Sequence, residues 1–93
     1  MLEFAFTRSF QKSLKRLHSH EKVAIQREVD SFMLAMDVRQ VPTGFGLKKL
    51  GSDLWEFRAD LPIRVLFQWD KRTITFLFVG NHNEVQRFLK HYQ

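Results

Sequence analysis

The chain contains no cysteine, and its 93 residues include only four glycines and two prolines. Without cysteine there can be no disulfide bond or thiolate-metal site, so packing alone must hold the fold together. No Gly-rich phosphate loop or serine-nucleophile motif is present, and no apolar run is long enough to span a bilayer. The first residues lack the basic leader of a signal peptide. We therefore expect a cytoplasmic protein without a membrane partner.

Positive charge and aromatic side chains are what the chain has in excess. Fifteen Lys and Arg against ten Asp and Glu give a net charge of +5, which favours encounter with polyanions or with an acidic protein. Ten Phe and a hydrophobic content of 44% supply one core but not two. We expect a single domain over residues 1–93. A basic surface that is merely solvated stays open as an alternative.

Apolar periodicity predicts a strand followed by two helices in the first part of the chain. Residues 2–6 suit an edge strand, and Thr7 can cap the helix that follows. Ser19 offers a cap for a second helix. The apolar residues of that helix recur at helical spacing; they are Ile25, Val29, Phe32, Met33 and Met36.

Residues 39–53 are expected to form a loop with little regular structure, because Pro and Gly recur there at Pro42, Gly44, Gly46 and Gly51. Three strands in antiparallel order are predicted next, at residues 54–59, 63–69 and 73–79. Asn81 and Glu84 are spaced as a capping box before a closing helix. The order β-α-α-β-β-β-α predicts an α+β fold, with a meander packed against helices.

One face of the sheet is predicted to carry charge. On the strand at 63–69, alternation places Arg64 with Leu66 and Gln68, opposite the apolar residues that face the core. Glu56 and Arg58 share a face on the preceding strand. Arg64 therefore interrupts an apolar strand on the side away from the core. The alternative is that Arg58 and Arg64 only solvate this side, pairing with Glu56 or Asp60.

Histidines are the candidates for proton transfer. His82 begins the last helix, and a neutral imidazole there can accept a proton. The alternative is a surface histidine that takes part in the helix cap. His18 and His20 are two residues apart, a spacing that does not place both on one helical face. We expect no metal site and no cofactor.

Three segments of the second half resemble a known family. Leu54–Arg58 reads LWEFR, Ile63–Phe67 reads IRVLF, and Phe78–Val85 reads FVGNHNEV. Together they resemble the RelE/ParE toxin superfamily of type II toxin–antitoxin systems, nearest to its RelE and YafQ branches. The order of elements agrees over the whole chain, while the motifs begin at Leu47. The resemblance implies a RelE-like fold.

The resemblance also implies a function. RelE and YafQ toxins cleave mRNA in the ribosomal A site, so a metal-independent endoribonuclease that stops translation is expected. Its partners would be a cognate antitoxin, the ribosome and mRNA, with operator DNA reached only through the antitoxin. Two alternatives stay open: a ParE-like gyrase inhibitor, and a non-catalytic RelE-like module that only binds RNA or an antitoxin.

Four residues match catalytic positions of that family. Arg64 matches the arginine that RelE-like toxins use against the scissile phosphate, and Arg58 stands near a position held by lysine in RelE and histidine in YafQ. Lys48 resembles a replacement for an upstream histidine of YafQ. His82 resembles the YafQ histidine after the last strand. We expect His82 to act as base or acid, Arg64 to clamp the phosphate, and the other two cations to stabilise charge.

The chain departs from the family at two places. Gln86 stands where RelE has a catalytic tyrosine and YafQ a phenylalanine, and Pro62 stands where YafQ has an aspartate. The second proton-transfer group is therefore missing, and Lys48 or a ribosomal group would have to supply it. Lys49, Gln86 and Arg87 are expected to bind RNA beside the catalytic residues.

Overall fold

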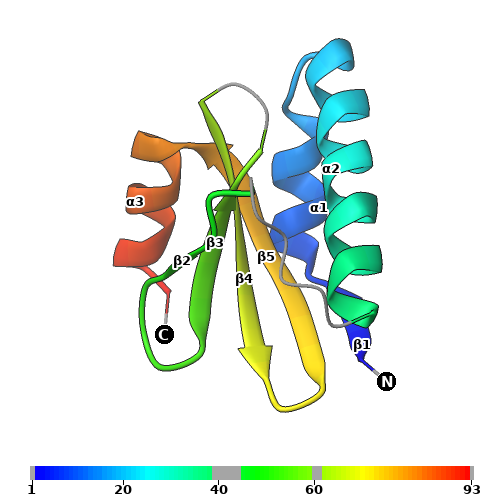
Figure 1. Ribbon diagram of the computed structural model, residues 1–93. Coiled ribbons are helices and arrows are strands. Elements are labelled where there is room, and N and C mark those ends of the chain that lie inside the picture. The colour runs from blue at the N-terminus through cyan, green and yellow to red at the C-terminus, as the bar shows by residue number, and fades with distance from the viewer. Residues whose placement is uncertain (1, 39–44, 60–61, 93) are drawn as a thin grey trace.

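The computed structural model describes residues 2–38, 45–59 and 62–92 as a sheet with helices on both faces (Figure 1). The elements are β1 (Glu3–Phe6), α1 (Arg8–Lys15), α2 (Ser19–Asp37), β2 (Lys48–Lys49), β3 (Leu54–Arg58), β4 (Ile63–Asp70), β5 (Thr73–Asn81) and α3 (His82–Lys90). The strand order is β1-β5-β4-β3-β2. β1 runs parallel to β5, and the other neighbouring strands are antiparallel. The predicted α+β fold and the three antiparallel strands are confirmed.

The segment predicted as a loop contains one additional strand. Lys48 and Lys49 form β2, which pairs antiparallel with β3. The expectation of little regular structure is wrong for these two residues, because the chain returns along β3 and pairs with its edge. The chain already contacts the end of β3 three residues before β2, where the carbonyl of Phe45 accepts a hydrogen bond of 2.7 Å from the Arg58 N–H. Pro42 and Gly44 lie outside the described residues.

Thr7 joins the edge strand β1 to α1, as predicted. Its hydroxyl oxygen accepts a hydrogen bond of 3.0 Å from the backbone N–H of Phe10, which caps the helix. The same hydroxyl donates to the carbonyl of Phe76 on β5 at 3.1 Å. One side chain therefore starts α1 and fixes its position against the sheet.

α2 begins at Ser19, with His18 as its N-cap, so the predicted cap at Ser19 is wrong. The reason is Glu21, whose carboxylate accepts a hydrogen bond of 3.0 Å from the His18 N–H. His18 and Glu21 thus form a capping box, and the helix is capped one residue before Ser19. The apolar stripe is confirmed: Met33 is half-buried and the buried members are Ile25, Val29, Phe32 and Met36. No described helix is long and apolar enough to cross a membrane.

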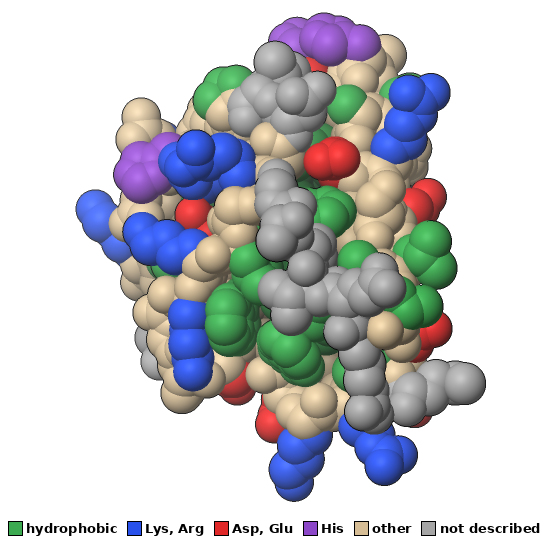
Figure 2. Space-filling view, viewed as in Figure 1, with side chains coloured by type: hydrophobic (Ala, Val, Ile, Leu, Met, Phe, Trp, Pro, Cys, Tyr) green, Lys and Arg blue, Asp and Glu red, His purple; other side chains and the backbone are tan. Residues whose placement is uncertain are grey.

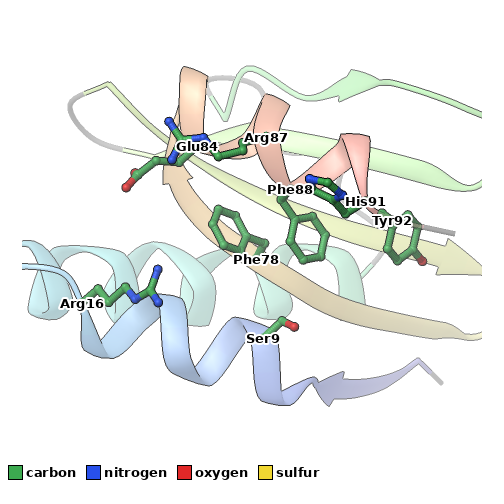
Figure 3. Close-up of a pocket in the computed structure, with 8 residues that line it drawn as sticks. All are labelled: Ser9, Arg16, Phe78, Glu84, Arg87, Phe88, His91 and Tyr92. Atoms are coloured by element: carbon green, nitrogen blue, oxygen red, sulfur yellow. The ribbon is translucent and has the colours of Figure 1, made fainter.

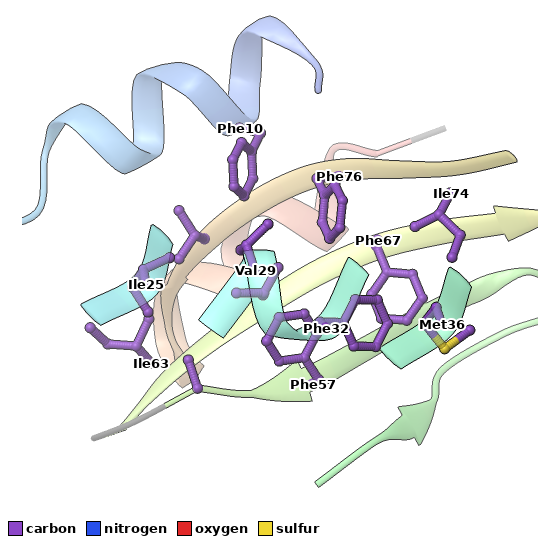
Figure 4. Packing of buried hydrophobic residues seen from close by; sticks show 13 residues of the cluster. Phe10, Ile25, Val29, Phe32, Met36, Phe57, Ile63, Phe67, Ile74 and Phe76 are labelled. Carbon is purple, nitrogen blue, oxygen red and sulfur yellow. The ribbon is translucent and has the colours of Figure 1, made fainter. Parts of the chain in front are cut away.

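The main core lies between the sheet and the two N-terminal helices (Figure 4). Phe32 of α2 is at its centre, with ring centroids 4.5 Å from Phe57 and 4.9 Å from Phe67. All three rings are fully buried, as is Phe76 of β5. Each such ring removes a large apolar area from water, and the close ring pairs add to that stabilisation.

α3 covers part of the opposite face of the sheet. Beneath it lies a second apolar cluster of Leu66, Leu77 and Val85. Leu66 lies on the face predicted for it, away from the main core, but it is fully buried there under α3, so only part of this face carries charge. A bulge in β5 adds to this cluster: Leu66 pairs with Phe78 and Phe67 with Phe76, which leaves Leu77 as an extra residue. Leu77 and Phe78 consequently both turn toward α3.

The central ring of the main core provides a test of this packing. Replacing Phe32 by Ala should lower the free energy of unfolding by about 3–5 kcal/mol, because it removes buried contacts and leaves a cavity. Leu34→Ala is the matched control on the same helix, since Leu34 is 67% exposed. Its effect should stay within about 0.5 kcal/mol. Urea unfolding measures both, and similar losses for the two variants would contradict the described core.

Candidate functional site

A small hollow opens where β2, β3, β4 and the start of α3 meet. Its volume is about 130 Å³. We call it the cationic hollow, and its lining residues are Gly46, Lys48, Leu50, Glu56, Arg58, Arg64, His82 and Gln86. All four residues predicted as catalytic are among them. Figure 2 shows Lys and Arg side chains gathered around α3, β2 and β3, with a histidine among them.

Strand register brings the cations of the hollow together. Arg58 at the end of β3 is directly opposite Arg64 near the start of β4. Lys48 of β2 is opposite Glu56, two residues before Arg58 on the same face of β3. Like charges directly opposite each other destabilise a sheet. The two arginines therefore need a compensating negative charge nearby.

Glu56 supplies that charge. Its Oε2 lies 3.1 Å from Nη1 of Arg64, and the two side chains are 8% and 22% exposed. Of the alternatives left open by the sequence, pairing of Arg64 with Glu56 is therefore the correct one, and Asp60 lies outside the described residues. The Nε of Arg64 is buried and has no hydrogen-bond partner among the described residues. Arg64 thus has both a structural contact and an unused donor.

His82 enters the hollow because α3 begins immediately after β5. The cap is made by Asn81, whose N–H donates to Glu84 Oε1 at 2.8 Å and whose side chain accepts from the Glu84 N–H at 2.9 Å. The predicted capping box is confirmed. The alternative that His82 serves in the cap is wrong, because its neighbours make both bonds. Gln86, one turn later on α3, lines the same hollow.

Gly80 allows α3 to begin this close to the sheet. A Cβ built at Gly80 would lie 2.8 Å from Oε1 of Glu84 and 3.0 Å from the ring of Phe78. Neither neighbour is free to move away, because Glu84 belongs to the capping box and Phe78 packs in the second cluster. Gly80 is also directly opposite Arg64 in the sheet. The absence of a side chain there allows α3, which begins with His82, to start close to the sheet.

Two of the residues predicted to bind RNA lie outside the hollow. Lys49 follows Lys48 on β2 and so points to the opposite face, where its Nζ is 5.6 Å from the ring centroid of Trp55. Arg87 lies on the other side of α3 from His82, along a groove beside α1. Lys49 is thus separated from the hollow by the sheet, and Arg87 is separated from it by α3.

Glu56 is the residue that sequence reasoning undervalued. The sequence offered it only as an ion-pair partner of Arg58 or Arg64, not as a member of the site. Its place on the same strand face as Arg58, together with the pairing of the two strands, could have indicated that it lies beside both arginines. The structure makes it a buried carboxylate inside the hollow.

The hollow therefore combines three cations, one carboxylate and one imidazole. An anion with several oxygens suits the arginines, because a guanidinium can donate two parallel hydrogen bonds to it. The carboxylate and the imidazole are groups that can transfer protons. Within the described ranges, no three His, Asp or Glu side chains come close enough together to hold a metal ion.

Comparison with known proteins identifies the fold. No sequence-family profile matches the chain, and no curated protein matches it by sequence. Solved structures match it over almost its whole length. A chain of the RelB–RelE antitoxin–toxin complex from Methanococcus jannaschii has a TM-score of 0.68 at 16% identity, over 90% of this chain and 96% of that one.

Two further structures give the same result. YafQ from E. coli strain BL21(DE3) has a TM-score of 0.69 at 10% identity and covers 91% of this chain and 98% of its own. A copper-bound mutant toxin from Helicobacter pylori has a TM-score of 0.69 at 16% identity, with 91% and 99% covered. The chain thus has the fold of RelE-like toxins, as the sequence resemblance implied.

The close approach at Gly80 can be tested without an assay of activity. Gly80→Ala should push Glu84 away from the Asn81 N–H, lower stability by about 1–3 kcal/mol, and shift the ring resonances of His82. Gly51→Ala is the control, because its Cβ would meet only the Cβ of Leu54 at 3.6 Å. Thermal unfolding and NMR measure both effects. An unchanged His82 environment in Gly80→Ala would show that this glycine does not determine its position.

Proposed function

We propose that the chain is the toxin of a type II toxin–antitoxin pair and that it inhibits translation by cleaving mRNA at the ribosome. The observation that carries the proposal is the cationic hollow, where Lys48, Arg58 and Arg64 surround one carboxylate and His82. The fold shared with RelE and YafQ supports it independently. The proposed site of action is the cytoplasm, where ribosomes and mRNA are found.

The size of the hollow limits what it can bind. A volume of about 130 Å³ is well below the roughly 300–1,000 Å³ of pockets that enclose a small-molecule ligand. It suits a single phosphodiester group, not a whole nucleotide. In this proposal the partly exposed Arg64 side chain donates to the phosphate oxygens. Arg58 and Lys48 stabilise the negative charge that develops on the phosphorus-bound oxygens.

Glu56 and His82 together supply the proton transfers. RNA cleavage without a metal needs a base for the 2′-hydroxyl and an acid for the leaving oxygen. Glu56 takes the 2′-hydroxyl proton as the 2′-oxygen attacks phosphorus. His82 in its protonated form gives a proton to the 5′-oxygen as the bond from phosphorus to that oxygen breaks. The products are a 2′,3′-cyclic phosphate and a free 5′-hydroxyl. Glu56 thus fills the role for which the sequence offered only Lys48 or the ribosome.

The same geometry supports the proposed dependence on the ribosome. A hollow that holds little more than a phosphate cannot align the 2′-oxygen with the phosphorus by itself. Alignment of reacting groups contributes several kcal/mol to catalysis, on the order of 7–11 kcal/mol in favourable cases. In the proposal the ribosome provides this alignment by holding the mRNA. Free RNA should therefore be a poor substrate.

An antitoxin is the proposed protein partner. RelE from Methanococcus jannaschii was solved in a complex with RelB, and YafQ in a complex with DinJ. The net charge of +5 favours an acidic partner. An acidic antitoxin segment over the cationic hollow would neutralise Lys48 and Arg58, which are both exposed. Contact with operator DNA would then be made only through the antitoxin.

Purified protein added to translating ribosomes should cleave the mRNA and leave naked RNA nearly intact. It should keep its activity when a chelator removes transition metals while the Mg²⁺ that ribosomes require is retained. Mapping the mRNA ends measures the cleavage, and a DNA supercoiling assay with gyrase serves as the parallel control. Inhibition of gyrase with intact mRNA would favour the ParE-like alternative. Binding of RNA without cleavage or gyrase inhibition would favour the non-catalytic module.

The two partners of the ion pair should respond differently to substitution. Arg64→Ala should lower cleavage about 100-fold or more, the loss expected for one charge-stabilising donor. It should also reduce stability, because it leaves the Glu56 carboxylate buried without a partner. Glu56→Gln keeps the shape and should lower cleavage by about 10²–10⁴-fold at near-normal stability. Arg72→Ala, in the exposed turn before β5, is the control.

Cleavage rates and urea unfolding of all three variants decide the assignment. If Glu56→Gln cleaves at the wild-type rate, Glu56 is only a structural partner of Arg64. If Arg64→Ala cleaves normally, Arg64 does not contact the scissile phosphate.

A further inference from the structure

A second and larger depression lies on the other side of α3, between that helix and α1. Its volume is about 500 Å³, which is within the roughly 300–1,000 Å³ of small-molecule sites. We call it the α1–α3 groove. Figure 3 shows the rings of Phe78 and Phe88 side by side between the two helices, with Ser9 on α1 and Arg16 at the C-terminal end of that helix. Its remaining lining residues are Glu84, Arg87, His91 and Tyr92.

The floor of the groove is a column of three aromatic rings. The centroids of Phe78 and Phe88 are 4.7 Å apart with the rings nearly parallel, and those of Phe88 and Tyr92 are 5.7 Å apart. All three side chains are only half-buried. The four rings at the centre of the main core are fully buried, whereas the three rings of the groove are partly exposed and so available to a flat ligand.

The rim of the groove is positively charged. Arg16 and Arg87 are exposed, and neither forms an ion pair with any acidic side chain of the described ranges. The acidic residue of the rim is Glu84, but its carboxylate already accepts a hydrogen bond of 2.8 Å from the Asn81 N–H. The field over the groove therefore favours an anionic group.

α3 joins this groove to the cationic hollow. His82 and Gln86 on one side of the helix line the hollow, while Arg87 and Phe88 on the other side line the groove. An RNA strand whose phosphate lies in the hollow would therefore reach the groove if it continued across the first turn of α3. The hollow itself is too small for a base and ribose, so the adjoining nucleotides need contacts elsewhere.

We propose that the α1–α3 groove binds one nucleotide of an RNA strand. Its base packs against the Phe78–Phe88–Tyr92 column, and its phosphate is held by Arg16 and Arg87. Stacking platforms beside cationic side chains are how proteins bind single strands without reading their sequence. This inference rests on the proposed function in one respect: the strand is the one whose phosphodiester occupies the hollow.

The experiment titrates AMP and a short 2′-O-methyl oligoribonucleotide into the isotope-labelled protein. Neither ligand can be cleaved, because AMP has no internucleotide bond and the oligonucleotide lacks the 2′-hydroxyl nucleophile. Ring resonances of Phe78, Phe88 and Tyr92 should move, and the indole resonances of Trp55 and Trp69 should not. Phe88→Leu should weaken binding about tenfold or more through lost stacking. Arg87→Gln should also weaken it and reduce its salt dependence.

Arg27→Gln is the matched control, because it removes the same charge from the exposed surface of α2. Equal weakening by Arg27→Gln and Arg87→Gln would show that only net charge matters and would overturn the proposal. The proposal would also be overturned if the ring resonances responded to an amphipathic, Glu-rich peptide but not to AMP. The groove would then be a protein-docking surface.

The outcome can be separated from that of the proposed function. AMP bound in the groove, together with intact mRNA in the ribosome assay, would support the nucleotide site and overturn the proposed cleavage. If the protein cleaves mRNA but neither ligand binds in the groove, the proposed cleavage would be supported and the nucleotide site would be overturned.

Discussion

Burial of β4 on both faces is the constraint on which the rest of the structure depends. Val65 and Phe67 turn to the main core, while Leu66 between them is fully buried in the second cluster under α3. A strand that is buried on both faces can carry a charged side chain only where the covering helix ends. Arg64 lies at that point, opposite Gly80 and beside the first turn of α3. The place of the hollow is thus a consequence of how far the helix extends over the sheet.

The charges of the hollow are balanced by an interaction that is costly to bury. Glu56 and Arg64 lose most of their hydration, and their attraction offsets that cost only if their remaining polar atoms also find partners. The Nε of Arg64 has none among the described residues. The ion pair therefore recovers only part of the cost of burying its two charges. The opposition of Arg58 and Arg64 across the strands adds like-charge repulsion to that cost.

Local signals in the sequence predicted most of the fold. Thr7 and the Asn81–Glu84 box marked helix starts through hydrogen bonds within a few residues, and both are present. β2 could not be predicted, because two residues carry no periodicity and the strand exists only through its pairing with β3. Alternation also assigned the faces of β4 correctly, yet it could not show that α3 covers one of them. Four catalytic candidates meet in one hollow, whereas the role of Glu56 depended on contacts between strands.

α3 positions the side chains of the hollow and of the groove on its two sides. Its capping box fixes the first turn, so His82 and Gln86 are presented to the hollow from a rigid helix end. The bulge at Leu77 turns Phe78 toward the same helix, where it pairs with Phe88 and opens the aromatic column to the groove. One extra residue in β5 therefore anchors α3 by apolar packing and also exposes rings at its outer side. A change that alters the bulge would disturb the hollow and the groove together, because the position of both depends on how α3 packs on the sheet.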